Sequence, residues 1–169
     1  MKLSNLRFAK LYLRNAIFGV ADSLVSTVGL LAGIGVSGAN RSSIIVTGVI
    51  YAFVEAFSMA VGSFLSEESA EEYETKKESS HKKPFVAGVI MFISFVVASF
   101  VPLAPYVLFG ARTAMPISIG LSIVVLFLIG VASAKASKVD LLKSGAKMAL
   151  LGGSAIVIGT IIGRLLKQS

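Results

Sequence analysis

The chain has 169 residues, of which 55% are hydrophobic and only 15% are charged; soluble domains are charged at about a quarter of their positions, so this composition predicts a membrane protein. The net charge of +7 does not indicate nucleic-acid binding, because the basic residues lie in short clusters between apolar runs, where lipid headgroups are the expected counter-charge. The absence of cysteine excludes disulfides and thiolate metal sites.

Five apolar runs meet or approach the length of roughly 20 helical residues that a bilayer core requires. Backbone groups in lipid must bond to one another, so each run is expected to be a helix, and the predicted fold class is an all-α polytopic membrane protein with five transmembrane helices. The expected spans are Asn15–Val36, Ile44–Leu65, Phe85–Val101, Met115–Ala134 and Met148–Leu166. They predict one transmembrane domain over residues 1–169.

The third run is short, and the two prolines that follow it, Pro102 and Pro105, are expected to end its helix. At the other end of the chain, the segment from Leu3 to Arg14 mixes bases with Leu, Phe and Tyr. Such a segment is expected to lie along the cytoplasmic membrane interface, before the first span begins.

The basic residues are unequally divided between the two sides of the predicted spans. The side opposite the N-terminus holds Arg41, Arg112, Arg164 and Lys167. The N-terminal side holds Lys2, Arg7, Lys10, Arg14, Lys76, Lys77, Lys82, Lys83, Lys135, Lys138, Lys143 and Lys147. Because cytoplasmic loops carry the excess of lysine and arginine, this pattern predicts a cytoplasmic N-terminus and a C-terminus across the membrane.

Two carboxylic acids lie inside predicted spans, Asp22 in the first and Glu55 in the second. A charged side chain at the middle of a bilayer costs about 2.5–3.5 kcal/mol on insertion scales, so such acids indicate a functional site. A plainer interpretation places them near a membrane surface or pairs them with a base such as Arg14. Asp22 lies about 12 Å deeper than Arg14 along the helix, and no base lies in the interior of a span, since Arg164 is at the end of the fifth. The remaining ways to accommodate these two acids are protonation, a polar cavity or a bound cation.

Helical spacing adds further candidates to these two acids. Glu55 and Met59 are one turn apart, and a carboxylate beside a thioether suits a borderline-soft divalent metal such as ferrous iron, although methionine in a helix is more often an apolar filler. Gly29 and Gly33 share a face with Asp22 and form a G-x-x-x-G motif, which allows another helix to approach closely.

The segment at 66–84, SEESAEEYETKKESSHKKP, has no proline before its last residue and is expected to form a short cytoplasmic helix or loop that continues the second span. Its second half suits ion pairs one turn apart, Glu72 with Lys76 and Glu78 with Lys82. His81, a lone histidine among lysines, is expected to have a surface role rather than to bind metal.

The first half of this segment carries four acids at spacings that place like charges together. Such pairs are mildly destabilising, so they suggest a mouth that collects cations, although a solvated helix is the simpler alternative. The candidate metal-binding residues of the whole chain are therefore Asp22, Glu55 and Met59, with Glu67, Glu68, Glu71 and Glu72.

Two stretches resemble the first two spans of the vacuolar iron transporter family, which includes the nodulin-21-like proteins. They are AIFGVADSLVSTVGLLAGIGVSGA and EAFSMAVGSFLSEESAEEYE. The family shows Asp-Gly-Leu-x-Thr in span one, and Ser-Met-Ala-x-Gly-Glu-Tyr followed by a Ser- and acid-rich segment in span two. The chain departs from this pattern at Ser23, where the family prefers glycine, and at Ser63-Phe64, where it has Glu-Tyr. The loop after span two is also too short for the family's full cytoplasmic metal-collecting domain.

The resemblance implies a homodimeric five-helix transporter that moves ferrous iron, and often manganese, out of the cytoplasm against protons, with Asp22 and Met59 lining the metal path. The expected partners are metal ions, protons and lipids, and no permanently bound cofactor or nucleic acid. A proton-linked small-solute permease and a non-transporting membrane scaffold are the alternatives. An enzyme is least expected, because the chain has one histidine and no cysteine. The small size favours a prokaryotic plasma membrane, with an organelle membrane as the alternative.

Overall fold

The protein is described by a computed structural model of residues 3–167, in which the side chains of residues 3–7 and 9 are not described. Five helices make up these residues: α1 (Leu3–Ser37), α2 (Arg41–Thr75), α3 (Lys82–Leu108), α4 (Ala111–Ser137) and α5 (Leu141–Lys167). All five are long and apolar enough to cross a membrane. Each predicted span lies inside one helix, so the all-α multi-pass fold is confirmed.

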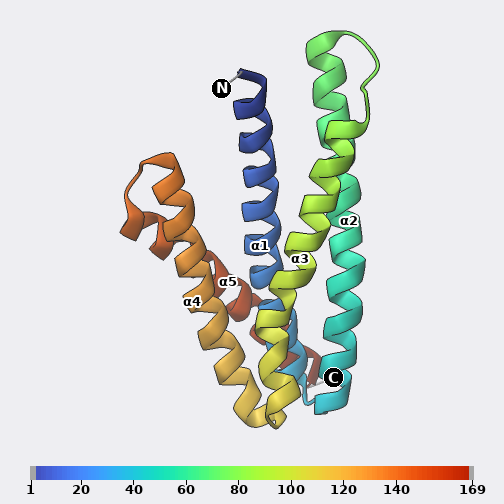
Figure 1. Cartoon of the computed structure of the whole chain (residues 1–169). Coiled ribbons are helices and arrows are strands. Elements are labelled where there is room, and N and C mark those ends of the chain that lie inside the picture. The colour runs from blue at the N-terminus through green and yellow to red at the C-terminus, as the bar shows by residue number, and fades with distance from the viewer. Residues whose placement is uncertain (1–2, 168–169) are drawn as a thin grey trace.

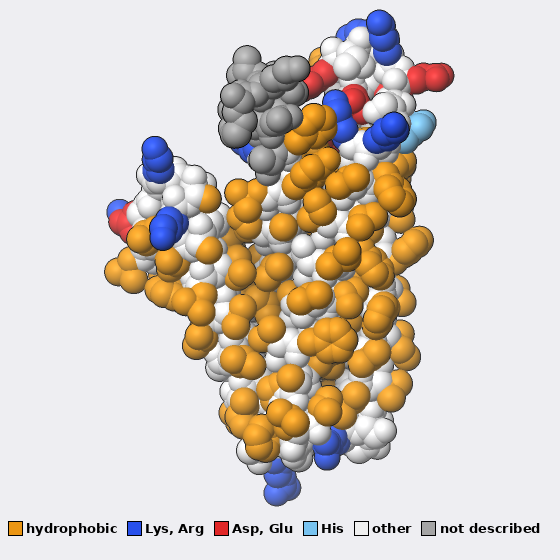
Figure 2. Space-filling model, viewed as in Figure 1, with side chains coloured by type: hydrophobic (Ala, Val, Ile, Leu, Met, Phe, Trp, Pro, Cys, Tyr) orange, Lys and Arg blue, Asp and Glu red, His pale blue; other side chains and the backbone are white. Residues whose placement is uncertain are grey.

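Successive helices run in opposite directions, so the connections alternate between the two ends of the bundle (Figure 1). The start of α1, the α2–α3 turn and the α4–α5 turn share what we call the N-terminal end, and the end of α5 lies at the far end (Figure 1). Apolar side chains cover the middle of the visible face, whereas charged side chains gather at its ends (Figure 2). The loop lysines assigned to one side therefore do lie together; the side chains of Lys2 and Arg7 are outside the described residues.

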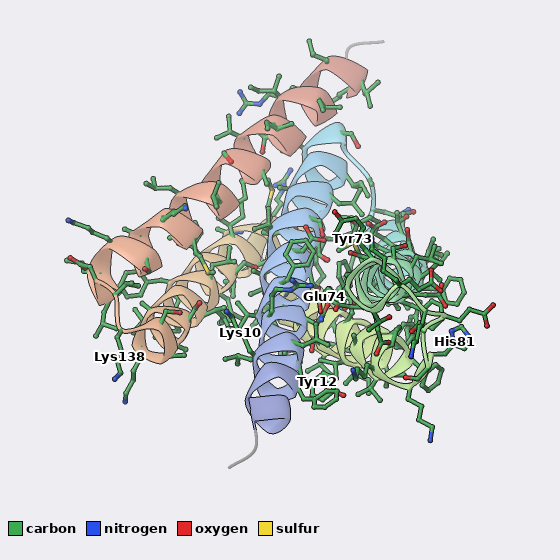
Figure 3. All side chains as sticks on the ribbon, turned by 90° about the horizontal axis from the view of Figure 1, so that it is seen from above. Lys10, Tyr12, Tyr73, Glu74, His81 and Lys138 are labelled. Carbon is green, nitrogen blue, oxygen red and sulfur yellow. The ribbon has the colours of Figure 1, made fainter. Side chains whose placement is uncertain are left out.

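The first helix occupies the centre of the bundle. It contacts each of the other four helices, and a view along the bundle shows it between the α2–α3 pair and the α4–α5 pair (Figure 3). The helix is continuous from Leu3 to Ser37. The expectation that residues 3–14 leave the bundle to lie along the interface is therefore wrong, because the helical hydrogen bonds continue without a break into the span.

The expected end of the third helix is also wrong, because α3 continues through Pro102 and Pro105 to Leu108. Membrane helices tolerate proline where neighbouring groups satisfy the disturbed backbone. This stretch of α3 is also bonded to its neighbours. The Ser118 hydroxyl on α4 donates a 2.7 Å hydrogen bond to the Pro102 carbonyl. The Arg41 guanidinium satisfies carbonyls of the last turn of α3, because its Nε donates to the Tyr106 carbonyl at 2.7 Å and a second nitrogen donates to the Val107 carbonyl.

The far end of the bundle is closed by an apolar cluster. It consists of Leu31, Ile44, Leu103, Tyr106 and Ala114, all buried and contributed by the first four helices. The N-terminal end has no comparable plug among the described residues, since the second cluster, Leu24, Ala98 and Leu126, lies nearer the middle. Access from the N-terminal end is therefore the less obstructed of the two.

The close approach predicted by Gly29 and Gly33 is made by α5, which presents its own glycines, Gly159 and Gly163. A Cβ atom added at Gly159 would lie 2.1 Å from the Gly29 carbonyl oxygen, and one at Gly163 would lie 2.1 Å from that of Gly33. Two G-x-x-x-G motifs thus meet backbone to backbone, which brings α5 against the centre of α1.

Replacing Gly159 with alanine should destabilise the protein by roughly 1–3 kcal/mol, because the new methyl group can be accommodated only if α5 moves away from α1. Gly153→Ala is the matched control on the same helix, since a Cβ there meets no atom within 4 Å. Thermal unfolding of the two purified variants in detergent measures the difference. Equal midpoints would show that the glycine crossing does not hold the helices together.

Two serines one turn apart on α4 differ in their hydrogen bonding. Ser118 and Ser122 are both fully buried, and Ser118 donates to Pro102. The Ser122 hydroxyl has no hydrogen-bond partner among the described residues, and the Thr27 hydroxyl on α1 is in the same condition. Burying a hydroxyl costs free energy because the group loses its hydrogen bonds to water. A hydrogen bond within the protein offsets this cost, and a hydroxyl without a partner has no such compensation.

Ser118→Ala and Ser122→Ala should therefore have unequal effects on stability, although they remove the same atom from neighbouring turns. Ser118→Ala should cost about 1 kcal/mol because a buried carbonyl loses its donor, and Ser122→Ala should be neutral or stabilising. Chemical unfolding of both variants under one set of conditions measures this. A loss at Ser122 as large as the loss at Ser118 would show that its hydroxyl is in fact bonded.

Candidate functional site

Polar side chains on the facing sides of α1 and α2 meet in pairs. Near the N-terminal end, the Ser63 hydroxyl donates a 2.7 Å hydrogen bond to the Asn15 side-chain oxygen, and both residues are buried. Because the helices are antiparallel, residues further along α1 face residues further back along α2. Two more pairs follow in this register towards the middle of the bundle: Asp22 with Glu55, and Ser26 with Tyr51.

The two intramembrane acids are therefore neighbours across the α1–α2 contact. Asp22 and Glu55 are each partly buried, and their carboxyl groups are close enough to interact electrostatically. Neither forms an ion pair with a base in the described part of the chain. Arg14, which could have neutralised Asp22, is paired with Glu67 instead. The structure thus brings two like charges together without a compensating base.

A cavity of about 550 Å³ lies on the N-terminal side of this acid pair. We call it the inner cavity; it is lined by Arg14, Asn15, Phe18, Ser58, Met59, Gly62, Ser63, Ser66, Glu67 and Met91. Phe18 is one turn before Asp22, and Met59 is one turn after Glu55. The cavity therefore ends one helical turn from both acids, and the predicted thioether of Met59 lines it.

The inner cavity also contains a residue that the sequence did not single out. Met91 on α3 is 3% exposed, and its sulfur lies against Gly19, since a Cβ added at Gly19 would be 3.1 Å from it. Two thioethers from different helices, Met59 and Met91, thus line the same cavity. No spacing within one span could have identified Met91, because it reaches the site through the packing of α3 against α1.

A groove of about 450 Å³ between α1 and α5 begins on the other side of the acid pair. Its lining includes Ser26, one turn after Asp22, then Gly29 and Gly33, and it reaches Ser37 and Leu166 near the far end. The Ser26 hydroxyl donates a 2.7 Å hydrogen bond to the Asp22 carbonyl. Asp22 therefore lies between two hollows that extend towards opposite ends of the bundle.

The two departures from the family's sequence pattern both form contacts between helices. Ser23 is fully buried and donates a 2.7 Å hydrogen bond to the Phe95 carbonyl on α3. Ser63 donates to Asn15 on α1. These serines replace a glycine and an acid of the pattern, so the chain gains two interhelical hydrogen bonds and has one carboxylate fewer beside the inner cavity.

Three of the four candidate acids at the end of α2 form ion pairs within the chain. Residues 66–75 continue α2, Lys76 ends the helix in a left-handed conformation, and α3 begins at Lys82. Glu67 pairs with Arg14, Glu68 with His81 at 2.6 Å, and Glu71 with Lys83 at 2.8 Å. Glu72 accepts a weak 3.4 Å hydrogen bond from the Ser79 amide.

These pairings correct the expected one-turn pairs. Neither Glu72 with Lys76 nor Glu78 with Lys82 forms an ion pair within residues 66–84; Lys76 instead lies over the Tyr73 ring at 4.0 Å. The turn after α2 folds the chain back, so the bases of α3 reach acids of α2 that are more than two turns away in sequence. His81 does lie on the surface, but its Nδ1 is in contact with Glu68.

Glu71 shows the effect of this pairing most clearly. Its carboxylate accepts hydrogen bonds from Lys83 Nζ at 2.8 Å and from the Ser79 hydroxyl at 2.7 Å. These contacts, with the Lys83 bond the larger, hold the pKa of the Glu71 carboxyl below its ordinary value. The four-acid mouth predicted from the sequence is thus largely neutralised by the chain's own bases.

Within residues 3–167, no group of three or more His, Asp or Glu side chains is arranged to hold a metal ion. The seven candidate ligands form two sets. Asp22, Glu55 and Met59 lie near the midplane, and the four glutamates lie at the end of α2. The inner cavity lies between the two sets. One chain therefore offers two carboxylates and two thioethers near the middle of the bundle, which leaves part of a metal's coordination shell to other groups.

Comparison with known proteins agrees with this arrangement. The model of the VIT family matches residues 13–83 and 74–164. An uncharacterized protein of Methanocaldococcus jannaschii is 32% identical over 164 residues, covering 86% of this chain and 84% of its own. Two rice proteins (Oryza sativa subsp. japonica) are also similar: vacuolar iron transporter homolog 5, 28% identical over 94% of this chain and 82% of its own, and homolog 1, 29% identical over 84% and 68%.

The matched segments include all five helices and both of the stretches on which the resemblance was based. The structure and the comparisons therefore agree, and the chain belongs to the VIT family.

Proposed function

We propose that this protein is a membrane transporter of divalent transition-metal ions, with ferrous iron as its first substrate and manganese as its second. The observation that carries the proposal is the neighbouring pair Asp22 and Glu55, which has no basic partner within the described helices. The Met59 thioether one turn away suits the softer of these ions. The names of the rice relatives support iron as the substrate.

The acid pair explains how such an ion would be exchanged. Two carboxylates in an apolar bundle require a compensating positive charge. A divalent cation supplies it when the site is loaded, and protons supply it when the site is empty. Because metal ligands must be deprotonated, loading the ion releases those protons. The pair would thus couple the movement of metal to the movement of protons in the opposite direction.

The direction of transport follows from the charge of the two ends. The basic loops lie at the N-terminal end (Figure 2), which we assign to the cytoplasm by the excess of lysine and arginine. The inner cavity lies towards that end, and the apolar cluster closes the far end. This arrangement supports export from the cytoplasm. The archaeal relative supports a prokaryotic plasma membrane as the location.

The acids at the end of α2 have a secondary part in this proposal. Glu67, Glu68 and Glu71 each have a basic partner in the chain, so a metal must displace that partner before it can bind. Together with Glu72 they would attract cations weakly instead of holding them. The short loop would therefore act as a transient collecting surface.

Asp22→Asn and Glu55→Gln should each slow ferrous iron transport by about tenfold or more, because each removes a charge that the ion needs. The assay is uptake into proteoliposomes with an imposed proton gradient. Asp140→Asn is the matched control, since Asp140 is 54% exposed and caps α5 by accepting a hydrogen bond from the Lys143 amide.

Transport by Asp22→Asn at the rate of the unaltered protein would contradict the assignment of the site. Failure of the unaltered protein to move either metal, with metal-independent proton flux, would instead favour a small-solute permease. If no flux of any kind is seen and no metal raises the thermal stability, a membrane scaffold becomes the better interpretation.

We further propose that the working unit is a homodimer that meets along the polar side of α2. Ser58 on that helix is exposed, on the same side as Glu55. Polar groups facing lipid are unfavourable, and a second copy would cover them. It would also place a second Asp22–Glu55 pair beside the first and complete the coordination of the metal.

A cysteine at Ser58 should crosslink to its copy in membranes, because the chain has no cysteine of its own and the two residues would face each other. Val97→Cys is the control, since Val97 is 64% exposed on α3. Gel mobility after mild oxidation measures dimer formation. Equal crosslinking at both positions, or crosslinking at Val97 alone, would contradict this interface.

A further inference from the structure

Two cavities at the N-terminal end of the bundle meet at a single ion pair. The inner cavity lies beside Met59, and a second cavity of about 780 Å³, here called the outer cavity, lies between the start of α1 and the end of α2. The lining of the outer cavity includes Lys10, Glu71 and Glu74. Among the described residues, only two line both cavities, Arg14 and Glu67, and these two form an ion pair.

The position of the pair makes it a partition between the cavities. Arg14 belongs to α1 and Glu67 to α2, and the guanidinium donates a hydrogen bond to Glu67 Oε1 across the gap. The Glu67 side chain is only 16% exposed, whereas that of Arg14 is 67% exposed. Next to the pair on the inner side, the Asn15–Ser63 hydrogen bond holds the two helices together. Within the pair, the carboxylate is therefore the shielded partner and the guanidinium lies on the solvent side.

The electrostatics of this partition are suited to a cation as the trigger. A guanidinium at the threshold repels an approaching cation, and its carboxylate partner attracts one. The Arg14 side of the pair is open to solvent, so the guanidinium can be released to water at small cost once a cation takes its place beside Glu67. In the outer cavity, Glu74 carries a carboxylate without an ion-pair partner among the described residues, at the end of α2 opposite Lys10 (Figure 3).

We propose that Arg14 and Glu67 form a gate between the two cavities that a divalent cation opens. While the pair is intact, the inner cavity is closed to the outer one. A divalent cation attracted into the outer cavity competes with Arg14 for Glu67, the guanidinium swings out to solvent, and the passage opens. This inference rests on the proposed function in one respect, because the ion that opens the gate is the ion to be transported.

The gate accounts for a base at a position where a cation path would otherwise have none. A carboxylate alone would admit any cation, including the abundant monovalent ions. A monovalent cation interacts with the Glu67 carboxylate no more strongly than the Arg14 guanidinium does, so it does not displace Arg14. A divalent ion interacts more strongly and can displace it. A ligand shifts such an equilibrium only by its differential affinity for the two states, so the pair favours divalent ions before they reach the acids.

The test uses access to the inner cavity as its readout and does not require transport. Because the chain has no cysteine, Gly62→Cys provides a single reporter in the inner cavity, where an added side chain meets no atom within 4 Å. Thr75→Cys provides a matched reporter in the outer cavity. Each is reacted with a small, membrane-impermeant, positively charged thiol reagent in proteoliposomes, and the rate of modification is measured.

Glu67→Gln should speed modification of the Gly62→Cys reporter by about three- to fivefold, as expected for the loss of a weak ion pair. This variant separates a gate from simple attraction, because removal of a negative charge alone would slow a cationic reagent. The charge exchange Arg14→Glu with Glu67→Arg should restore slow modification. The Thr75→Cys reporter should react at similar rates throughout.

Addition of Mn²⁺ should speed modification of the Gly62→Cys reporter in the protein with the intact pair, and should have no further effect when Glu67→Gln is present. Potassium at matched ionic strength should not reproduce the Mn²⁺ effect. Fast modification with the pair intact, or rates unchanged by Glu67→Gln and by Mn²⁺, would overturn the gate.

The outcome for the gate is distinguishable from the outcome for the proposed function. Iron transport without any change in reporter access would leave the function in place and remove the gate. A reporter that responds to Mn²⁺ and to Glu67→Gln in a protein that moves no metal would leave the gate in place and remove the function.

Discussion

The structure depends on one face of α1. This face places a carboxyl group in the membrane, and it also allows another helix to pack with its backbone against the backbone of α1. Asp22, Ser26, Gly29 and Gly33 follow one another on this face. Towards the N-terminal end it meets α2, through side chains that are polar. Towards the far end it meets the glycines of α5, and a Cβ atom would not fit between them. The acid therefore lies where α1 changes partner, with a hollow on each side. A site between two hollows is the arrangement that exchange across a membrane requires.

The two departures from the family pattern, Ser23 and Ser63, contribute to helix packing instead of adding charge. Ser23 and Ser63 both form buried hydrogen bonds between helices, the first to α3 and the second to α1. Each such bond contributes about 1 kcal/mol, so the central helix is held at both of its polar faces. Glu55 is the carboxylate of α2 that faces Asp22, whereas Ser63 faces Asn15 nearer the N-terminal end. The midplane acids of one chain are two carboxylates, which would match the charge of one divalent ion.

The sequence was sufficient to predict what depends on local composition. Apolar length identified all five helices, and the spacing of Gly29 and Gly33 indicated a close helix contact without saying which helix makes it. The continuation of α3 through Pro102 and Pro105 was missed because it depends on the packing of α3 against neighbouring helices, including the bonds from Ser118 and Arg41, which local sequence does not show. The pairs Glu68–His81 and Glu71–Lys83 were missed because they form only after the chain turns back at Lys76. Met91 was missed because it reaches the inner cavity through the packing of α3 against α1, which spacing within one span does not show.

The pairing of the acids at the N-terminal end changes what those acids can do. An unpaired cluster of carboxylates would hold a divalent ion too firmly to release it into the inner cavity. In this chain each of three glutamates competes with a base of the same chain, and such exposed pairs are individually weak. A passing ion therefore gains only the difference between its own affinity and that of the base it displaces. In the proposed transporter, an ion would therefore bind only weakly at the mouth, and the unpaired acids Asp22 and Glu55 deeper in the bundle would attract it most strongly. This gradient would draw an ion inward without a strong site along the way.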